Sequence, residues 1–418
     1  NLQTFQDSNS VYKPSNEREA SNIIKEIYNK NLPIKIIGTN SKNFIGNKLQ
    51  CTKVLDLSSL SGIVEYLPDE LYIKVKACTP ISLIEETLEK NNQQLAFEPI
   101  DFGYIKNFKS NKGTAAGQLS CNFSGSRRFK MGSIRDHVLG FRGINGKGDI
   151  IKSGGTVVKN VTGYDLSKLV TGSFGTLTAL TEITFKVLPA KDSINTIAIY
   201  SEDNKTVTNL FDQLLSSSNE ISGLAYIPNE PKNNNYTINR EKILKFNDLK
   251  SEEAFLALRI EGSKKSIEER NKEIFKELEL RKMKTSILDF YQSKLFWEKI
   301  NNIELFSGTK NNLLRLIIPP AKSLDLMKYL KDNFKYYIDW GGSLFWLEVL
   351  DEENEKIKEI KDIVFKLGGY LTIVKYSENL SSDIDLFTIN DTRLLLSKKI
   401  KESFDPKNLF NPGKMYRE

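Results

Sequence analysis

The stretch KNVTGYDLSKLVTGSFGTL, residues 159–177, combines three glycines, a Tyr-Asp pair and several small hydroxyl residues. It lies between two strand-like runs, yet it matches neither the GxxxxGK[ST] phosphate loop nor the GxGxxG dinucleotide fingerprint. Glycine lets backbone N–H groups approach a ligand closely, because no Cβ stands in the way. The stretch therefore predicts a segment pressed against a ligand, with Gly163 turning the chain and with Gly172 and Gly175 making room.

Two further glycine-containing segments occur in the same half of the chain. They run from Gly38 to Gly46 and from Gly113 to Gly125, and each follows or separates strand-like runs. A single loop of this kind is more often a structural turn than a binding loop. Three of them in one half favour a ligand of nucleotide size.

The composition predicts a soluble, cytoplasmic protein of two or three domains. The chain has 418 residues, of which 39% are hydrophobic and 27% charged. The formal net charge is +7, but basic residues alternate with acidic ones, as in residues 264–282, which indicates solvated helix faces and not a nucleic-acid groove. Cys51, Cys78 and Cys121 are far apart and form no metal-binding pattern. No run approaches the ~18 apolar residues that a membrane span needs.

The spacing of apolar residues changes near residue 191. Before it, we expect a helix over residues 17–30 and a hairpin that turns at residues 145–148, where Asn-Gly supplies the positive φ of a tight turn. After it, strands alternate with amphipathic helices, a pattern that predicts an α+β lobe with one sheet covered on one side. We therefore expect domains over residues 1–190 and 191–400.

Six short motifs in order carry a family resemblance. These are the Gly-Thr that opens the second loop, SGxRR, GxxRDxVLG, GGxVxKNVxGYDL, GSxGTL and the tail NPGxMY. Residues 113–189, which contain most of them, resemble the FAD-binding domain of the vanillyl-alcohol oxidase/PCMH flavoprotein superfamily. Within it, the chain is most similar to the family of FAD-binding E subunits of bacterial glycolate oxidase.

The resemblance implies an α+β fold in which a PCMH-type FAD-binding lobe of two subdomains faces an α+β cap lobe. It implies noncovalent FAD, since no histidine or cysteine stands at the expected attachment place, and a tail, residues 401–418, that returns to the FAD lobe. By motif matching, the resemblance implies these cofactor-binding residues: Gly38, Thr39, Asn40, Ser41, Gly113, Thr114, Gly117, Ser120, Gly125, Arg135, Gly172, Ser173, Gly175, Thr176, Ile183 and Asn411.

Two positions depart from the family pattern. The first loop commonly reads Arg-Gly-Gly-Gly, but residues 37–40 here are Ile-Gly-Thr-Asn, which predicts weaker diphosphate contacts. Ser126 stands where proline is usual, which affects local stiffness only.

Several polar residues have both a functional and a structural interpretation. Arg127 and Arg128 suit a substrate carboxylate or a partner subunit, or equally an ion pair with Asp136 or Asp165. Asp165 is better explained as the N-cap of the following helix, and Tyr164 as either a hydroxyl near the flavin or a buried ring.

No catalytic residue can be assigned from the sequence. His137 is the only histidine, and its place in the alternating run RDHVLGFR indicates a structural role. Residues 191–418 therefore lack the histidine cluster that catalytic relatives are expected to use for metal and base, and we expect no metal site. Trp297, Trp340 and Trp346 are better explained as cap core than as flavin-facing rings.

The resemblance implies an FAD-dependent oxidoreductase subunit of a glycolate oxidase complex. It would support oxidation of glycolate to glyoxylate, a 2-hydroxy acid reaction, together with a sister FAD subunit and an iron–sulfur subunit, and would meet the inner membrane peripherally through these partners. One alternative is a self-sufficient FAD-dependent oxidoreductase that acts on a hydroxy acid or sugar alcohol without a histidine base. Another is a binding protein whose altered first loop no longer holds FAD.

Overall fold

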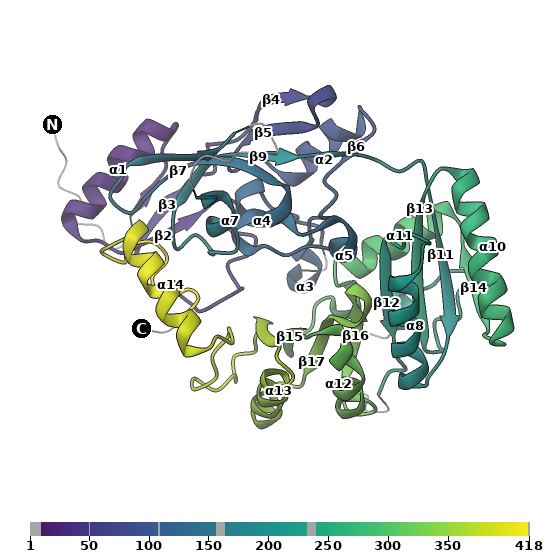
Figure 1. Cartoon of the computed structure of the whole chain (residues 1–418). Coiled ribbons are helices and arrows are strands. Elements are labelled where there is room, and N and C mark those ends of the chain that lie inside the picture. The colour runs from purple at the N-terminus through teal and green to yellow at the C-terminus, as the bar shows by residue number, and fades with distance from the viewer. Residues whose placement is uncertain (1–9, 50, 108, 156–163, 232–239, 417–418) are drawn as a thin grey trace.

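The N-terminal part of the chain contains two sheets. The structure is a computed structural model that describes residues 10–49, 51–107, 109–155, 164–231 and 240–416 (Figure 1). A three-stranded parallel sheet has the order β1-β3-β2, and a five-stranded antiparallel sheet has the order β4-β5-β9-β7-β8. The strands are β1 Val11–Tyr12, β2 Ile34–Ile37, β3 Lys53–Asp56, β4 Ile63–Leu67, β5 Tyr72–Lys76, β7 Val138–Ile144, β8 Ile150–Gly154 and β9 Ala179–Lys186. A short ribbon pairs β6 Gln93–Gln94 with β10 Leu188–Pro189.

Short helices cover these sheets. They are α1 Glu17–Lys30, α2 Ile81–Glu89, α3 Gly103–Asn107, α4 Ala115–Cys121, α5 Arg128–Met131, α6 Ile134–His137 and α7 Leu166–Val170. Helix α2 packs Ile84 and Leu88 against Val75 and Ile183 of the larger sheet. The predicted helix over residues 17–30 and the β7–β8 hairpin are both confirmed.

A single antiparallel sheet organises the C-terminal part. Its strand order is β14-β11-β13-β12-β16-β17-β15-β18. The strands are β11 Ser193–Tyr200, β12 Gly223–Ile227, β13 Phe255–Gly262, β14 Thr285–Leu288, β15 Asn312–Ile317, β16 Lys335–Asp339, β17 Leu344–Val349 and β18 Tyr370–Lys375. The helices are α8 Asn204–Ser216, α9 Arg240–Ile243, α10 Lys264–Leu280, α11 Phe290–Asn301, α12 Ser323–Leu330, α13 Asn354–Lys366 and α14 Asp391–Phe404. Short 3₁₀ turns occur at Pro68–Glu70, Glu304–Phe306, Pro320–Lys322 and Trp340–Gly342.

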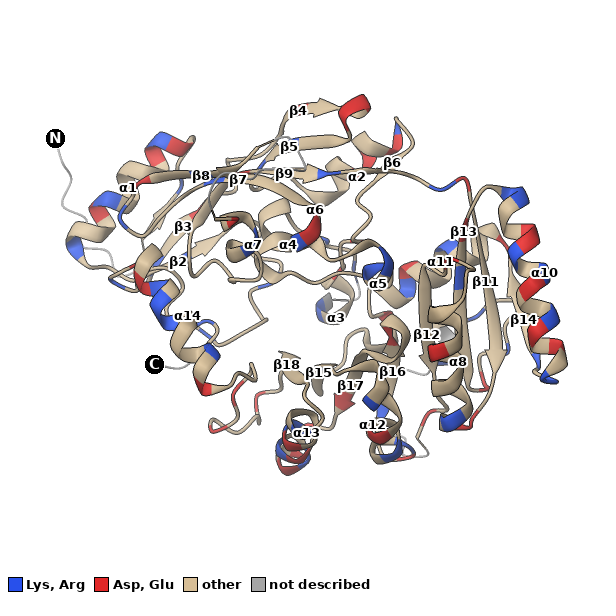
Figure 2. Ribbon diagram, viewed as in Figure 1, with Lys and Arg blue, Asp and Glu red and all other residues tan. Residues whose placement is uncertain are grey.

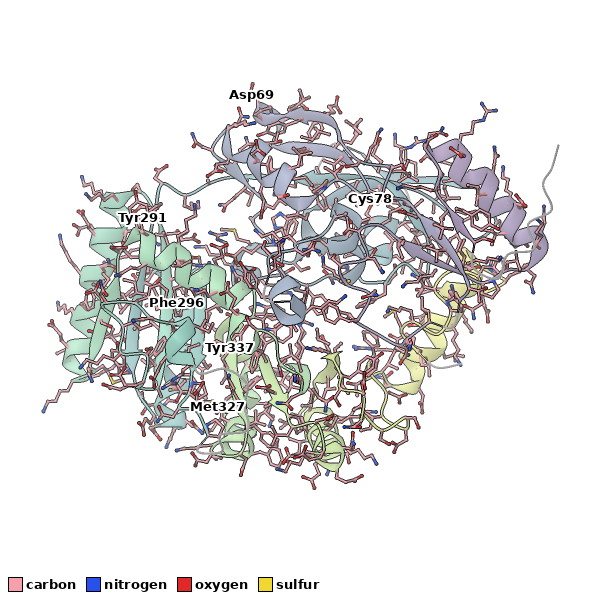
Figure 3. All side chains as sticks on the ribbon, turned by 180° about the vertical axis from the view of Figure 1, so that it is seen from behind. Asp69, Cys78, Tyr291, Phe296, Met327 and Tyr337 are labelled. Carbon is pink, nitrogen blue, oxygen red and sulfur yellow. The ribbon has the colours of Figure 1, made fainter. Side chains whose placement is uncertain are left out.

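Both faces of this sheet are covered, so the expectation of cover on one side is wrong. Helices α8, α10, α12 and α13 pack on one face, where Met327 belongs to the core. Helix α11 packs Phe296 on the other face, near Tyr337, and Phe102 and Phe123 of the N-terminal lobe join the same cluster (Figure 3). The second face is therefore the one that docks against the N-terminal lobe.

The charged helix is solvated, as its sequence predicts. Basic and acidic residues alternate along α10, which lies at the outer side of the cap (Figure 2). None of the helices in the described part of the chain has the length and apolar character that a membrane crossing needs. The domain boundaries near residues 190 and 400 stay a prediction, although the tail contacts the N-terminal lobe, where the Ile34 N–H donates to the carbonyl of Leu409.

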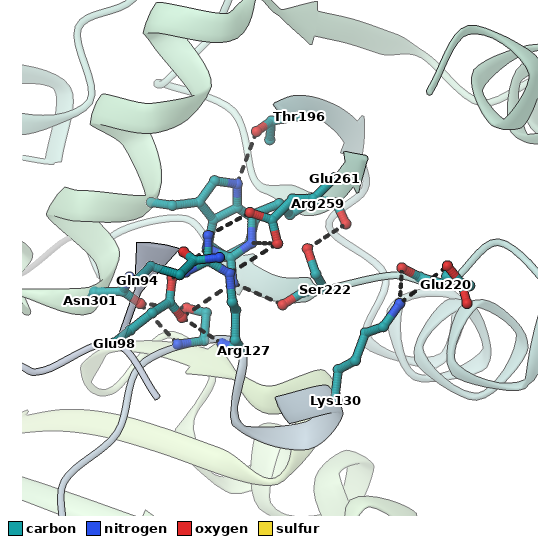
Figure 4. A network of polar contacts seen from close by, with 12 residues as sticks. Gln94, Glu98, Arg127, Lys130, Thr196, Glu220, Ser222, Arg259, Glu261 and Asn301 are labelled. Carbon is teal, nitrogen blue, oxygen red and sulfur yellow. Dashed lines mark hydrogen bonds and ion pairs between the residues drawn. The ribbon is translucent and has the colours of Figure 1, made fainter. Parts of the chain in front are cut away.

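A buried network of two arginines and two glutamates joins the lobes (Figure 4). The N-terminal lobe supplies Glu98 and Arg127, and β13 of the cap supplies Arg259 and Glu261. Glu98 accepts from Arg259 at 2.8 Å and from Arg127 at 3.0 Å, and Arg127 also meets Glu261 at 2.5 Å. Burial alone would raise the pKa of Glu261, but the charges of Arg259 and Arg127 hold it well below its usual range.

Replacing Glu98 by glutamine should destabilise the protein strongly. The change leaves two buried guanidiniums with one carboxylate, and breaking a buried pair in this way lowers the free energy of unfolding by about 3 kcal/mol. Urea unfolding of Glu98→Gln measures the loss. As a control, Glu277→Gln removes the exposed carboxylate that pairs with Arg281 and should change the free energy of unfolding by less than about 1 kcal/mol. Equal effects of the two substitutions would contradict a structural role for the network.

Candidate functional site

A cleft in the N-terminal lobe brings the first two predicted loops together with the C-terminal tail. The empty volume of the cleft is about 840 Å³, including its open mouth. Nine of the predicted cofactor residues line it: Gly38, Thr39, Asn40, Ser41, Thr114, Gly117, Ser120, Gly175 and Asn411. Gly113 adjoins the cleft next to Ser41. Sequence positions more than 300 residues apart therefore meet at one wall.

The two loops approach each other so closely that a side chain at Gly113 would not fit. Gly113 has a φ of +73°, and a Cβ there would clash with the Oγ of Ser41. In the first loop, Asn40 has a φ of +58°, a conformation that asparagine tolerates better than most residues. The loop thus keeps a left-handed turn at a position where the family has glycine.

Asn411 joins the tail to both sides of the cleft. Its Oδ1 accepts from the N–H of Ile36 at 2.9 Å, and its Nδ2 donates to the carbonyl of Phe174 at 2.9 Å. A Cβ at Gly175, where φ is +70°, would lie 2.7 Å from that Nδ2. Asn411 therefore holds the end of β2 against the GSxGTL motif.

The cleft is lined by cations. Lys35, Lys42 and Lys414 contribute to the wall, and no aspartate or glutamate is among the described lining residues. The Nζ of Lys42 donates to the carbonyl of Lys112 at 2.8 Å, and that of Lys414 to the carbonyl of Asn43 at 2.9 Å. Burial lowers the pKa of Lys42, and it lowers the pKa of Lys414 to about 8. Within the described residues neither lysine forms a salt bridge with a carboxylate, so this wall fits an anionic ligand.

This donor set fits the diphosphate of FAD. The two converging loops present backbone close to the ligand space, and the lysines supply positive charge at the same wall. The sequence motifs did not single out Lys42 or Lys414. Both are nevertheless close in sequence to a predicted residue, since Lys42 directly follows Ser41 and Lys414 lies three positions after Asn411.

A second hollow adjoins the first. Its empty space is about 1160 Å³, and it lies between α7, α14 and the tail. Gly172, Ser173 and Thr176 line it, and it shares Asn411 and Lys414 with the cleft. The GSxGTL motif therefore separates two connected spaces, while Gly163 lies outside the described residues.

Three predicted cofactor residues lie away from both spaces. Gly125 contacts the cap, where its carbonyl accepts from the Nε1 of Trp340 at 2.9 Å. Arg135 is exposed on α6 and donates to the carbonyl of Lys168, and Ile183 is fully buried in β9. Their roles in cofactor binding stay predictions.

The two arginines of SGxRR have different environments. Arg127 forms the interface network described above and not the predicted pair with Asp136 or Asp165. Arg128 lies over Trp340 instead, with its Cζ 4.3 Å from the ring centroid.

The other sequence-based assignments are mostly structural. Asp165 caps α7, as predicted, whereas Tyr164 is 94% exposed, so the buried interpretation is wrong.

His137 is buried at the end of α6 and not within a strand, and its Nε2 lies 2.8 Å from the carbonyl of Met131. Burial lowers the pKa of His137. Trp297, Trp340 and Trp346 belong to the cap core, as predicted.

Asp339 is a buried acid that the sequence did not reveal. Its Oδ2 lies 2.6 Å from the Oγ of Ser126, and that Oγ lies 2.9 Å from the Oδ1 of Asn301. One hydroxyl proton cannot serve both acceptors, and a protonated Asp339 resolves this by donating to Ser126. Burial raises the pKa of Asp339 to about 7, in agreement with this arrangement.

Asp339→Asn should remove a pH dependence of stability. Between pH 4 and 7 the folded protein keeps a proton on Asp339 that the unfolded chain releases, so the free energy of unfolding falls by up to about 1.4 kcal/mol per pH unit. Asparagine can make the same contacts without a carboxyl proton. The free energy of unfolding of Asp339→Asn, measured in urea relative to the wild type, should therefore increase from pH 5 to pH 8. For the exposed control Asp165→Asn, the difference in free energy of unfolding from the wild type should be the same at both pH values. A constant difference for position 339 would contradict the neutral carboxyl.

The comparisons with known proteins agree with FAD as the cofactor. A family model described as an FAD binding domain matches residues 9–154. The chain is 31% identical over 389 residues to glycolate oxidase subunit GlcE of Escherichia coli K12, covering 92% of this chain and 93% of the relative.

A more distant relative and a solved structure agree with this family assignment. Glycolate oxidase subunit GlcD of Bacillus subtilis 168 is 24% identical, covering 72% of this chain and 68% of the relative. The structure of 4-ethylphenol oxidase from Gulosibacter chungangensis has the same fold, with a TM-score of 0.69 at 12% identity over 98% of this chain and 89% of that one. The chain therefore belongs to the PCMH-type FAD-binding flavoproteins, in the group of glycolate oxidase subunit GlcE, and is an FAD-linked oxidoreductase of the glycolate oxidase type.

Proposed function

We propose that this chain binds FAD noncovalently in the lysine-lined cleft and serves as one subunit of a glycolate oxidase complex. In the complex it would act with a sister flavoprotein and an iron–sulfur subunit in the oxidation of glycolate to glyoxylate. The observation that carries this proposal is the convergence of Gly38–Ser41, Thr114–Ser120 and Asn411 on a cationic wall. The names of the relatives, subunits GlcE and GlcD, support an assembly of several chains.

The chain's own residues have separable tasks in this proposal. Lys42 and Lys414 would neutralise the diphosphate, and the Gly113 turn would bring the second loop within reach of it. Asn411 would keep the tail against the cofactor. Bound FAD supplies an acceptor for a hydride equivalent. The sequence has no histidine outside the buried His137, so the usual imidazole base for a substrate hydroxyl is missing from this chain.

Lys42→Met should weaken FAD binding without unfolding the protein. The substitution removes a buried charge that has no carboxylate partner in the cleft, so the apoprotein should be no less stable. The dissociation constant for FAD should rise at least about tenfold, because a charge-assisted contact is lost. Flavin fluorescence titration of the apoprotein measures this constant.

The matched control is Lys74→Met, which removes a lysine of β5 that pairs with Glu65 outside the cleft. It should leave the dissociation constant unchanged. The purified chain should be yellow and should release all its flavin on denaturation. Flavin that stays with the denatured chain would exclude noncovalent binding, and equal FAD affinities of the wild type and Lys42→Met would exclude the proposed wall.

Glycolate-dependent dye reduction tests the division of labour. The purified chain alone should reduce little dye, and addition of the sister flavoprotein and the iron–sulfur subunit should restore the activity. Bleaching of the flavin of the isolated chain by 2-hydroxy acids in stopped flow, with strong turnover, would favour the self-sufficient oxidoreductase instead.

A further inference from the structure

A lysine and an aspartate hold the end of α14 against the N-terminal lobe. The Nζ of Lys401 donates to the Oδ2 of Asp405, four positions later, at 2.6 Å. Asp405 is buried, and both side chains line the second hollow. No residue of α14 is buried, and within the described residues only its Phe404 packs against a core cluster. The position of the helix end therefore depends on the polar contacts of this pair.

The same ammonium group reaches two backbone carbonyls that are far apart in the sequence. Lys401 donates to the carbonyl of Thr176 at 2.7 Å and to that of Phe410 at 2.8 Å. Together with Asp405, these acceptors match the three N–H donors of a lysine. Thr176 belongs to the GSxGTL motif, and Phe410 belongs to the tail. One side chain thus joins α14, the motif and the tail.

Asp405 holds the tail at a second point. Its Oδ2 accepts from the N–H of Phe410 at 2.7 Å, so the pair bonds to both the N–H and the carbonyl of one residue. Phe410 also forms a parallel bridge with Ile34 of β2. A side chain at Gly146, in the turn of the β7–β8 hairpin, would clash with Asp405. The carboxylate is therefore fixed between the tail and the hairpin turn.

These contacts reach the proposed FAD wall through Asn411, the next residue of the tail. Asn411 bonds to Ile36, just before the first loop, and to Phe174 in the GSxGTL motif. Asn411 and Thr176 both line the second hollow, and Asn411 also lines the cleft. A displacement of Lys401 would therefore move both sides of the wall between the two spaces.

Stability alone does not account for a buried ion pair at this place. Apolar side chains of similar volume often stabilise a protein as well as a buried ion pair does, because removing charges from water costs free energy. They cannot, however, bond to backbone groups in fixed directions. The pair of Lys401 and Asp405 is therefore better explained by the orientation that it gives to the backbone of the motif and the tail.

We propose that Lys401, oriented by Asp405, is a positioning residue for FAD. It sets Asn411 and the GSxGTL motif in the arrangement that binds the cofactor, without being part of the lining of the cleft. The inference rests on the proposed function, because it takes FAD as the ligand of the cleft. It deepens that function by assigning part of the binding free energy to residues outside the cleft.

The double substitution Lys401→Met/Asp405→Asn tests this role without leaving a buried charge unpaired. Asparagine still offers an oxygen to the N–H of Phe410, so the variant should fold, and urea unfolding of the apoprotein should be cooperative. The dissociation constant for FAD, measured by flavin fluorescence titration, should rise at least about tenfold. The control Lys399→Met changes an exposed lysine of the same helix and should leave this constant unchanged.

Hydrogen exchange measured by mass spectrometry reports on the wall independently of FAD. In the apoprotein, the amides of residues 405–416 should exchange faster in the double variant than in the wild type, whereas exchange in α10 should be the same in both. At saturating FAD, the visible circular dichroism of the bound flavin should also differ between the two proteins. A loss of global stability alone would not change the spectrum of the bound flavin.

Three outcomes would overturn the proposal. Equal FAD affinities of the wild type and the double variant would show that the pair has only a structural role. Weaker FAD binding without faster exchange in the tail would make Lys401 a direct ligand of FAD. An equal loss of affinity in Lys399→Met would assign the effect to the charge of α14. A wild-type chain that binds no FAD would overturn the proposed function itself, and the same titration shows this separately.

Discussion

The buried network of Glu98, Arg127, Arg259 and Glu261 joins the two lobes by ion pairs. Each lobe supplies one cation and one anion, so neither lobe can balance its own charges as well alone as with the other. The geometry is demanding, since buried ions are tolerated only when their partners are close and well oriented. The network therefore links β13 of the cap sheet to the N-terminal lobe.

In the proposed diphosphate site, buried cations would accommodate the departure of the first loop from the family pattern. Three glycines in a row would offer backbone N–H groups and little else, whereas this chain has Thr39 and Asn40 there. Asn40 keeps the left-handed turn, and Lys42 and Lys414 bring positive charge to the same wall. Glycine-rich loops bind a diphosphate through backbone N–H groups. In the proposed site, buried lysines would supply binding energy to the diphosphate instead, because charges interact strongly where water is largely excluded.

The sequence predicted local features better than long-range ones. Helix 17–30, the β7–β8 hairpin and the Asp165 cap follow from spacing and capping rules that act over a few residues. Strands β12, β14 and β16 were not anticipated, because they are short, and β12 and β16 are buried on both sides and so lack an alternating pattern. Helix α11, which has 12 residues, was not anticipated either. Motif matching led to nine residues of the cleft. It could not reveal Lys42 or Asp339, whose importance depends on tertiary neighbours.

The loop SGSRR explains why two adjacent arginines need not share a role. Its backbone is fixed by Trp340 and Asn301, which bond to Gly125 and Ser126, so the directions of the next two side chains are set by the cap. Arg127 points into a pair of carboxylates, whereas Arg128 lies over the ring of Trp340, with its Cζ 4.3 Å from the ring centroid. Neighbouring positions of one loop therefore make an ion-pair contact and a cation–π contact with the cap.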